Sequence, residues 1–143
     1  MLLVAAQLRK LRIEKALTQS QVGAFIQMSA TNYQKFEYGY NKPSIEQLIA
    51  FAKGLDTSVE YLTRGRENNV VYMEEVVPFH KRLKELREQN DMTQKQLAAL
   101  IGSNESGVQK YEYNENIPRL ERIIQLADIF GVTMDDMVGR VKK

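Results

Sequence analysis

The side chains of this chain that could do chemistry are suited to hydrogen bonding rather than to catalysis. His80 is the single histidine, cysteine is absent, and the carboxylates are spread out without forming a paired acid and base. The sequence also lacks a glycine-rich phosphate loop. Without thiols there are no disulfides and no thiolate metal sites. We therefore expect no enzyme activity, no metal and no cofactor. The remaining candidates are polar side chains that recur at fixed spacing.

Two groups of polar side chains recur 75 residues apart. A shift of that length aligns Leu8 to Arg64 with Leu83 to Gly139 without a gap. The identities include a threonine and two glutamines in one stretch, and a Gln-Lys-x-Glu-Tyr string in the next. Such a register over so many positions is the mark of an internal repeat. The chain is a duplicated domain.

Apolar spacing and capping signals predict five short helices in each copy. Val4, Leu8 and Leu11 recur at helical spacing. A capping box is expected at Thr18 and Gln21, and the second copy repeats it. Further helix starts are marked by N-cap residues or prolines, which are Ser29, Pro43 and Ser58 in copy one and Asn104, Pro118 and Thr133 in copy two. The sequence predicts an all-α fold, with domains at 1–64 and 79–143 and a short linker at 65–78.

The turn after the second helix differs between the copies. Gly102 is suited to a left-handed C-cap in copy two. Gln27 stands at the equivalent place in copy one, where a side chain costs up to about 1 kcal/mol. The linker is also unusual, because its valines make it more apolar than a free tether. We expect it to pack against one or both copies, with a self-association strand as the alternative.

The repeated motif resembles a known family. The string T-Q-x-Q-V/L-x-x-x-I-x-x-S/N, followed after four residues by Q-K-F/Y-E-Y, occurs in both copies. It resembles the phage-repressor and Cro type of helix-turn-helix domain, the xenobiotic-response-element-like family. The resemblance implies that the third helix enters the DNA major groove while the second supports it. It implies a cytoplasmic, sequence-specific transcriptional regulator that binds double-stranded DNA, most simply a repressor.

The motif also assigns residues to the DNA interface. In copy one, the candidates for base contacts are Ala30, Thr31 and Lys35, with Asn32 and Gln34 nearby, and those for phosphate contacts are Gln19 and Lys42. The corresponding candidates in copy two are Gln94, Glu105, Ser106 and Lys110. The plain alternative for any such side chain is an exposed, solvated helix face.

Other motif positions have structural interpretations. The resemblance implies partly buried ion pairs between Arg12 and Glu37 and between Arg87 and Glu112. Tyr33 is expected in the core with its hydroxyl at the surface, with direct DNA contact as the alternative. The expected core residues are Val22, Ile26, Phe36, Leu48 and Ile49 in copy one and Leu97, Ile101, Tyr111, Ile123 and Ile124 in copy two.

Charge differs between the two copies. Residues 1–66 contain nine Lys or Arg and five Asp or Glu, a net charge of +4, whereas residues 67–143 contain eleven and thirteen, a net charge of −2. We therefore expect the first copy to dominate DNA binding. The alternative function is a protein-interaction module, antitoxin-like or anti-repressor-like, that keeps the fold without specific DNA recognition. No apolar stretch is long enough to span a membrane.

The linker allows more than one assembly. Fully extended, the fourteen residues 65–78 would reach about 46 Å. That exceeds the roughly 34 Å between half-sites one turn apart on a DNA duplex. The two copies could therefore act as an intramolecular pseudo-dimer, and a homodimer is the alternative.

Overall fold

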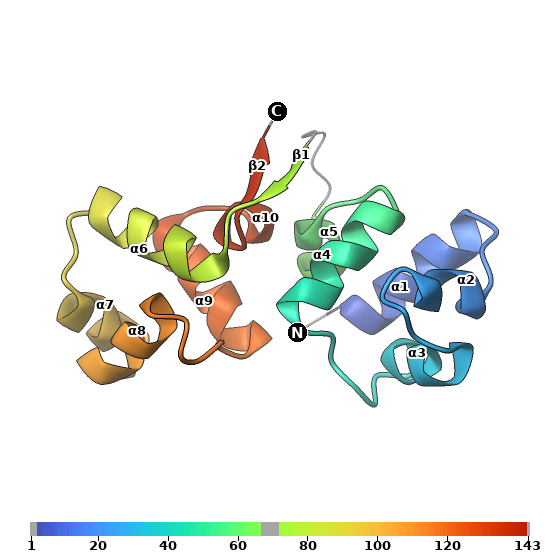
Figure 1. Ribbon diagram of the computed structural model, residues 1–143, viewed down its shortest axis with the longest axis horizontal. Coiled ribbons are helices and arrows are strands. Elements are labelled where there is room, and N and C mark those ends of the chain that lie inside the picture. The colour runs from blue at the N-terminus through green and yellow to red at the C-terminus, as the bar shows by residue number, and fades with distance from the viewer. Residues whose placement is uncertain (1–2, 67–71, 143) are drawn as a thin grey trace. The chain divides into compact units, whose positions relative to one another are not determined.

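The computed structural model describes residues 3–66 and 72–142, and it divides the chain into two compact units, Met1–Asn69 and Val70–Lys143. Within the described residues each unit holds five helices, as the sequence predicted (Figure 1). The first unit contains α1 Val4–Glu14, α2 Gln19–Ala24, α3 Ala30–Glu37, α4 Ile45–Gly54 and α5 Val59–Arg64. The second contains α6 Phe79–Gln89, α7 Gln94–Leu100, α8 Glu105–Glu112, α9 Leu120–Phe130 and α10 Met134–Met137.

Side-chain caps fix where the second and third helices of each unit begin. The Thr18 hydroxyl accepts a hydrogen bond from the Gln21 amide at 3.1 Å, and the Gln21 side chain accepts one from the Thr18 amide at 2.8 Å. Thr93 and Gln96 form the same capping box at the start of α7. Ser29 and Asn104 cap α3 and α8. These predicted caps are confirmed, and each typically contributes about 1 kcal/mol.

The turn between the two helices of each pair has the expected left-handed residue. Gln27 has φ of 56° and Gly102 has φ of 67°. A left-handed backbone is costly for a residue with a Cβ atom and free of that cost for glycine. The predicted strain at Gln27 is therefore present in the first unit and absent from the second.

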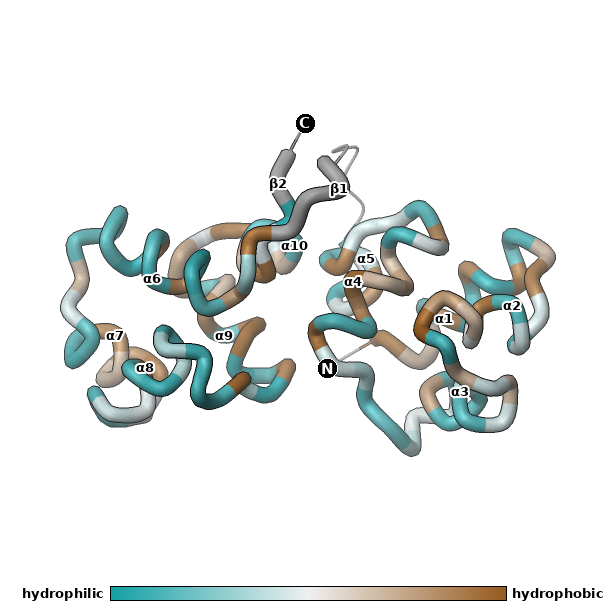
Figure 2. The backbone as a smooth tube through the Cα atoms, in the orientation of Figure 1, coloured by the Kyte–Doolittle hydropathy of each residue, from teal (hydrophilic) through white to brown (hydrophobic). Residues whose placement is uncertain are grey.

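Each unit has its own apolar core. In the first, the ring of Phe51 is in edge-to-face contact with the rings of Tyr33 and Phe36, with ring centroids 5.7 and 6.0 Å apart. Of the predicted core residues, six are buried, namely Val22, Phe36, Leu48, Leu97, Ile101 and Ile123. The other four are only half-buried, namely Ile26, Ile49, Tyr111 and Ile124. Along each helix, hydrophobic and hydrophilic stretches alternate, as expected of helices with one buried face (Figure 2).

A two-stranded antiparallel ribbon completes the second unit. Strand β1, Tyr72–Val76, pairs with β2, Arg140–Lys142. Next to the ribbon, the Val77 amide donates a hydrogen bond to the Gly139 carbonyl at 2.8 Å. A Cβ atom on Gly139 would lie 1.8 Å from the Val77 oxygen, and Gly139 has φ of 85°. Only glycine fits there. The expectation that the linker packs against a copy is thus confirmed, and its strand pairs within its own chain.

Because part of the linker forms strand β1, the free tether between the units is shorter than the sequence suggested. Because Tyr72–Val76 is held in the second unit, the tether between described parts of the chain runs only from Arg66 to Tyr72. Fully extended, that stretch spans at most about 22 Å. This is shorter than the roughly 34 Å between half-sites. The estimate of 46 Å was therefore too long, because it counted residues that belong to a strand.

Candidate nucleic-acid interface

A buried carboxylate joins three helices of the first unit. The Glu37 side chain is 1% exposed and accepts hydrogen bonds from Arg12 Nε at 2.5 Å and Arg12 Nη2 at 3.2 Å. It also accepts hydrogen bonds from Gln19 Nε2 at 3.1 Å and from the Tyr33 hydroxyl at 2.8 Å. Arg12 belongs to α1, Gln19 to α2, and Tyr33 and Glu37 to α3. This network holds α3 against its two neighbours.

The surroundings of Glu37 keep it ionised. Burial by itself raises the pKa of this carboxyl, but hydrogen bonds from Arg12, Tyr33 and Gln19 outweigh burial and lower the pKa below its ordinary value. Burial, followed by the hydrogen bond to Glu37, raises the pKa of Tyr33. Tyr33 therefore remains a protonated donor and Glu37 an ionised acceptor. The implied ion pair between Arg12 and Glu37 is confirmed.

Tyr33 differs from its expected placement. The residue is fully buried, and its hydroxyl points inward to Glu37 rather than to the surface. The predicted surface position of the hydroxyl was wrong, and so was the alternative of direct DNA contact. The physical reason is that a buried carboxylate one helical turn away offers the hydroxyl a stronger partner than water.

The second unit repeats the ion pair without the tyrosine. Arg87 donates to Glu112 from Nε at 2.7 Å and from Nη2 at 3.0 Å. Gln94 Nε2 donates to the same carboxylate at 3.2 Å. At the position of Tyr33 the second copy has Val108, which is buried. The second implied ion pair is thus also confirmed, although Glu112 has fewer donors.

The outward face of α3 gathers most of the predicted interface residues. Thr31, Asn32 and Lys35 are exposed, whereas Ala30 and Gln34 are half-buried. At 100° per residue, positions 31, 34, 35 and 38 lie on one side of the helix, and the buried positions 33, 36 and 37 lie on the other. The structure therefore brings Thr31, Gln34 and Lys35 together on a single face.

Two predicted phosphate contacts lie in different surroundings. Lys42 is exposed in the loop between α3 and α4. Gln19 is half-buried, with its amide nitrogen donating to Glu37 and its amide oxygen accepting from Gln34 Nε2 at 3.1 Å. Any phosphate contact by Gln19 is therefore limited to its backbone N–H or its second amide hydrogen.

Sequence reasoning missed an aromatic pair beside this face. Tyr38 and Tyr40 are both exposed, and their ring centroids lie 6.0 Å apart in an edge-to-face arrangement. The two tyrosines flank Gly39 in the sequence. That spacing alone does not reveal whether the rings are buried or exposed, and so it gave no usable signal.

The corresponding face of the second unit has a different character. Glu105, Ser106 and Lys110 are exposed on α8, and Gln94 is half-buried at the start of α7. Glu105 lies in the first turn of α8, where a carboxylate favours the helix dipole. At the position of Lys42 the second copy has Ile117, which is 64% exposed. This face has therefore lost a cation and gained a carboxylate.

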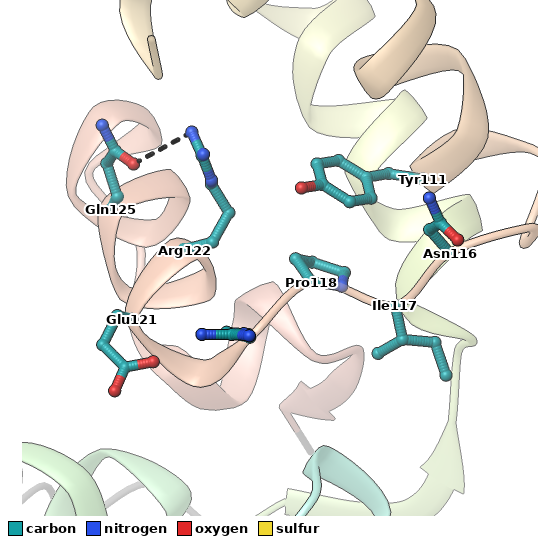
Figure 3. A pocket seen from close by; sticks show the side chains of 8 residues that line it. Tyr111, Asn116, Ile117, Pro118, Glu121, Arg122 and Gln125 are labelled. Carbon is teal, nitrogen blue, oxygen red and sulfur yellow. Dashed lines mark hydrogen bonds between the residues drawn. The ribbon is translucent and has the colours of Figure 1, made fainter. Parts of the chain in front are cut away.

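An open pocket of about 610 Å³ adjoins this face of the second unit (Figure 3). Its wall includes Tyr111 of α8, the loop residues 116–118 and the first turns of α9. Arg122 crosses from α9 to donate to the Ile101 carbonyl and also contacts the Gln125 side chain at 3.5 Å. In the first unit, Gln47 stands in place of Arg122 and completes a capping box.

The described part of the chain lacks both a membrane-spanning helix and a cluster of metal-binding side chains. In residues 3–66 and 72–142, no helix combines the length and the apolar character needed to cross a membrane. Over the same part of the chain, no group of three or more His, Cys, Asp or Glu side chains is placed to hold a metal ion.

The chain is similar in sequence to several known transcriptional regulators. A transcriptional repressor of the cryptic phage CTXphi, RstR of Vibrio cholerae, is 33% identical over 60 residues, which cover 42% of this chain and 54% of the relative. Two Bacillus subtilis helix-turn-helix regulators are also similar. YqaE is 32% identical over 68 residues (48% and 59% coverage), and AnsR is 37% identical over 62 residues (43% and 53%). The chain thus spans between half and three fifths of these relatives.

The names of these relatives describe two transcriptional regulators and one transcriptional repressor. No solved structure gives a significant match to the chain. The helix-turn-helix family model matches residues 8–62 and again residues 83–137, which together make up more than half of the chain. The chain therefore belongs to the helix-turn-helix family of transcriptional regulators, and it carries two tandem copies of the family's DNA-binding domain.

Proposed function

We propose that the protein is a cytoplasmic transcriptional repressor that recognises a specific DNA sequence with α3 of its first unit. The observation that carries the proposal is the division of α3 into two faces. Glu37 joins one face to α1 and α2 through hydrogen bonds from Arg12 and Gln19, while Thr31 and Lys35 stand exposed on the other face. A short helix held rigidly from behind, with polar side chains in front, suits insertion into a major groove.

The exposed side chains have chemistry that suits this role. Lysine donates to the O6 and N7 atoms of guanine, and the threonine methyl group can contact a thymine methyl. We assign Thr31, Asn32 and Lys35 to base contacts and Lys42 to a phosphate contact, with the Gln19 backbone amide at a second phosphate. Repression follows by analogy with RstR, which is named as a phage repressor.

The two units contribute unequally in this proposal. The net charge of +4 over residues 1–66 favours approach to DNA, whereas the net charge of −2 over residues 67–143 opposes it. Glu105 could still accept a hydrogen bond from cytosine N4. It nevertheless raises the electrostatic cost of placing α8 beside phosphates, so we assign a weaker DNA contact to the second unit.

A second candidate function concerns the second unit alone. Tyr113 and Ile117 are large apolar side chains that are about two thirds exposed on or beside α8. Exposed aromatic side chains such as Tyr113 are enriched at protein-protein interfaces. The second unit would then bind a protein partner while the first binds DNA.

The test is selection of bound fragments from random duplex DNA by the full chain, followed by titration of a selected duplex at several salt concentrations. Each cationic phosphate contact should add about −0.9 to the slope of log affinity against log salt. We expect a steep slope and a clear preference over random DNA. A flat slope without sequence preference would contradict DNA recognition and support the interaction module.

A further inference from the structure

A chain of hydrogen bonds runs from the buried ion pair to the outward face of α3. Arg12 holds Glu37, whose carboxylate accepts from Gln19 Nε2 at 3.1 Å. Gln19 Oε1 then accepts from Gln34 Nε2 at 3.1 Å. Gln34 is half-buried and lies on the same side of α3 as Thr31 and Lys35. The chain therefore links a buried charge to a side chain at the candidate DNA interface.

The Glu37 carboxylate determines how the side-chain amides of Gln19 and Gln34 are oriented in this hydrogen-bond network. An ionised carboxylate only accepts hydrogen bonds, so the group of Gln19 that faces Glu37 must be its NH2 group. The oxygen of Gln19 then faces Gln34, and it needs a donor there. Gln34 must accordingly turn its own NH2 group toward Gln19. Rotating the Gln34 amide by 180° would place two oxygens against each other.

This direction determines what Gln34 presents outward. An amide is planar, with its oxygen on one branch and its nitrogen on the other. When the N–H of Gln34 that lies trans to the amide oxygen is directed to Gln19, the oxygen and the N–H cis to it remain together at the other edge of the group. An oxygen beside an N–H is the pair that binds adenine, because adenine presents an N6 amino donor and an N7 acceptor in the major groove.

We propose that Gln34 is a specificity-determining residue that selects adenine, and that Gln19 and Glu37 are positioning residues that hold its amide in the adenine-binding orientation. This inference rests on the proposed DNA-binding function and extends it to one base pair. A glutamine whose amide could rotate freely could instead direct its two N–H donors outward and bind guanine, whose O6 and N7 are both acceptors. The hydrogen bonds from Gln34 to Gln19 and from Gln19 to Glu37 exclude that orientation of the Gln34 amide.

The second unit provides an internal comparison. Gln109 occupies the position of Gln34, and Gln94 occupies that of Gln19. Gln94 donates to Glu112, but no hydrogen bond joins Gln109 to Gln94 among the described residues of this unit. The hydrogen-bond network of the second unit therefore stops at Gln94. The side-chain amide of Gln109 should rotate freely, whereas that of Gln34 is held in one orientation. Gln109→Ala is thus the matched control for Gln34→Ala.

One arm of the test needs no DNA. Nuclear magnetic resonance of the full chain would follow exchange with water of the side-chain amide protons of Gln34 and Gln109. We expect a Gln34 Nε2 proton to exchange more slowly than those of Gln109, and Gln19→Ala to abolish that protection. Equal exchange in the two glutamines, or protection that survives Gln19→Ala, would overturn the positioning network.

The second arm measures base preference on a duplex selected by the wild-type chain. Affinity is compared for all four base pairs at each position. At one position the wild type should favour adenine over guanine by roughly 5- to 100-fold, as a bidentate base contact does. Gln34→Ala should abolish this preference, and Gln19→Ala should reduce it at the same position. Gln109→Ala should leave it unchanged.

Replacing that adenine with purine, which lacks the amino group, should weaken binding of the wild type and leave Gln34→Ala unaffected. A preference for guanine at the Gln34-dependent position would overturn the proposal. A uniform loss of affinity on Gln19→Ala, with base preference intact, would also overturn it. If the wild type binds no duplex selectively, the proposed function fails together with the adenine contact, while the exchange measurement still decides the positioning network separately.

Discussion

Arg12→Ala removes the main partner of a carboxylate that is almost fully buried. Breaking one side of a buried ion pair typically costs 3–5 kcal/mol. The Arg12 side chain is 16% exposed, and Tyr33 and Gln19 would still donate to Glu37. We therefore expect the lower end of that range, a loss of about 3 kcal/mol in the free energy of unfolding of the first unit.

The loss should depend on pH. In the wild type, the pKa of Glu37 is lowered from its ordinary value of 4.5, so its stabilisation is present above that pH and is lost as pH falls through the lowered folded-state pKa. Without Arg12, burial should dominate and raise the folded-state pKa of Glu37. The variant then loses stability as pH rises through that raised value. The difference from wild type should therefore be largest near neutral pH and shrink toward pH 4.

Hydrogen exchange measured by mass spectrometry at increasing denaturant can test this prediction, because peptides from each unit report the stability of that unit separately. Arg9→Ala is the matched control, since Arg9 is exposed on the same helix. A change within about 0.5 kcal/mol is expected there. If Arg12→Ala is as mild as Arg9→Ala, or if it abolishes DNA binding without loss of stability, then Arg12 is a DNA contact and the structural assignment is wrong.

Three further substitutions test other parts of the account. Gln27→Gly should stabilise the first unit by up to about 1 kcal/mol in denaturant unfolding, because it relieves a left-handed residue with φ of 56°; a loss of stability would argue against that strain. Gly139→Ala should destabilise the second unit, because the added Cβ atom would lie 1.8 Å from the Val77 oxygen. Faster hydrogen exchange in that unit would show the loss of stability, and unchanged exchange would count against the ribbon junction. Lys35→Ala should lower affinity for a selected duplex more than Lys110→Ala does, and equal losses would refute the unequal roles of the units.

Much of the fold was accessible from the sequence because its signals are local. Thr18 and Gln21 specify a capping box within one turn of helix, and the structure has it. The left-handed turn at Gln27 followed from alignment with Gly102 in the second copy. Duplication strengthened each such prediction, because an element expected in one copy had to fit the other as well.

The features that sequence reasoning missed depend on contacts between distant segments. Val76 and Arg140 are partners in the ribbon although more than sixty residues separate them. The inward direction of the Tyr33 hydroxyl depends on the carboxylate of Glu37, which is itself buried only because α1 and α2 pack around it. The bond between Gln19 and Gln34 likewise requires the packed arrangement of α2 and α3. Periodicity and capping rules contain no information about such pairings.

The most direct test of the central claim is a map of the surface that DNA covers. Hydrogen exchange of the full chain would be compared with and without a selected duplex. The account predicts the strongest protection at the start of α2 and over Ala30–Glu37, with weaker protection over Glu105–Glu112. Protection confined to the second unit, or centred on α4 and α5 of the first, would contradict it.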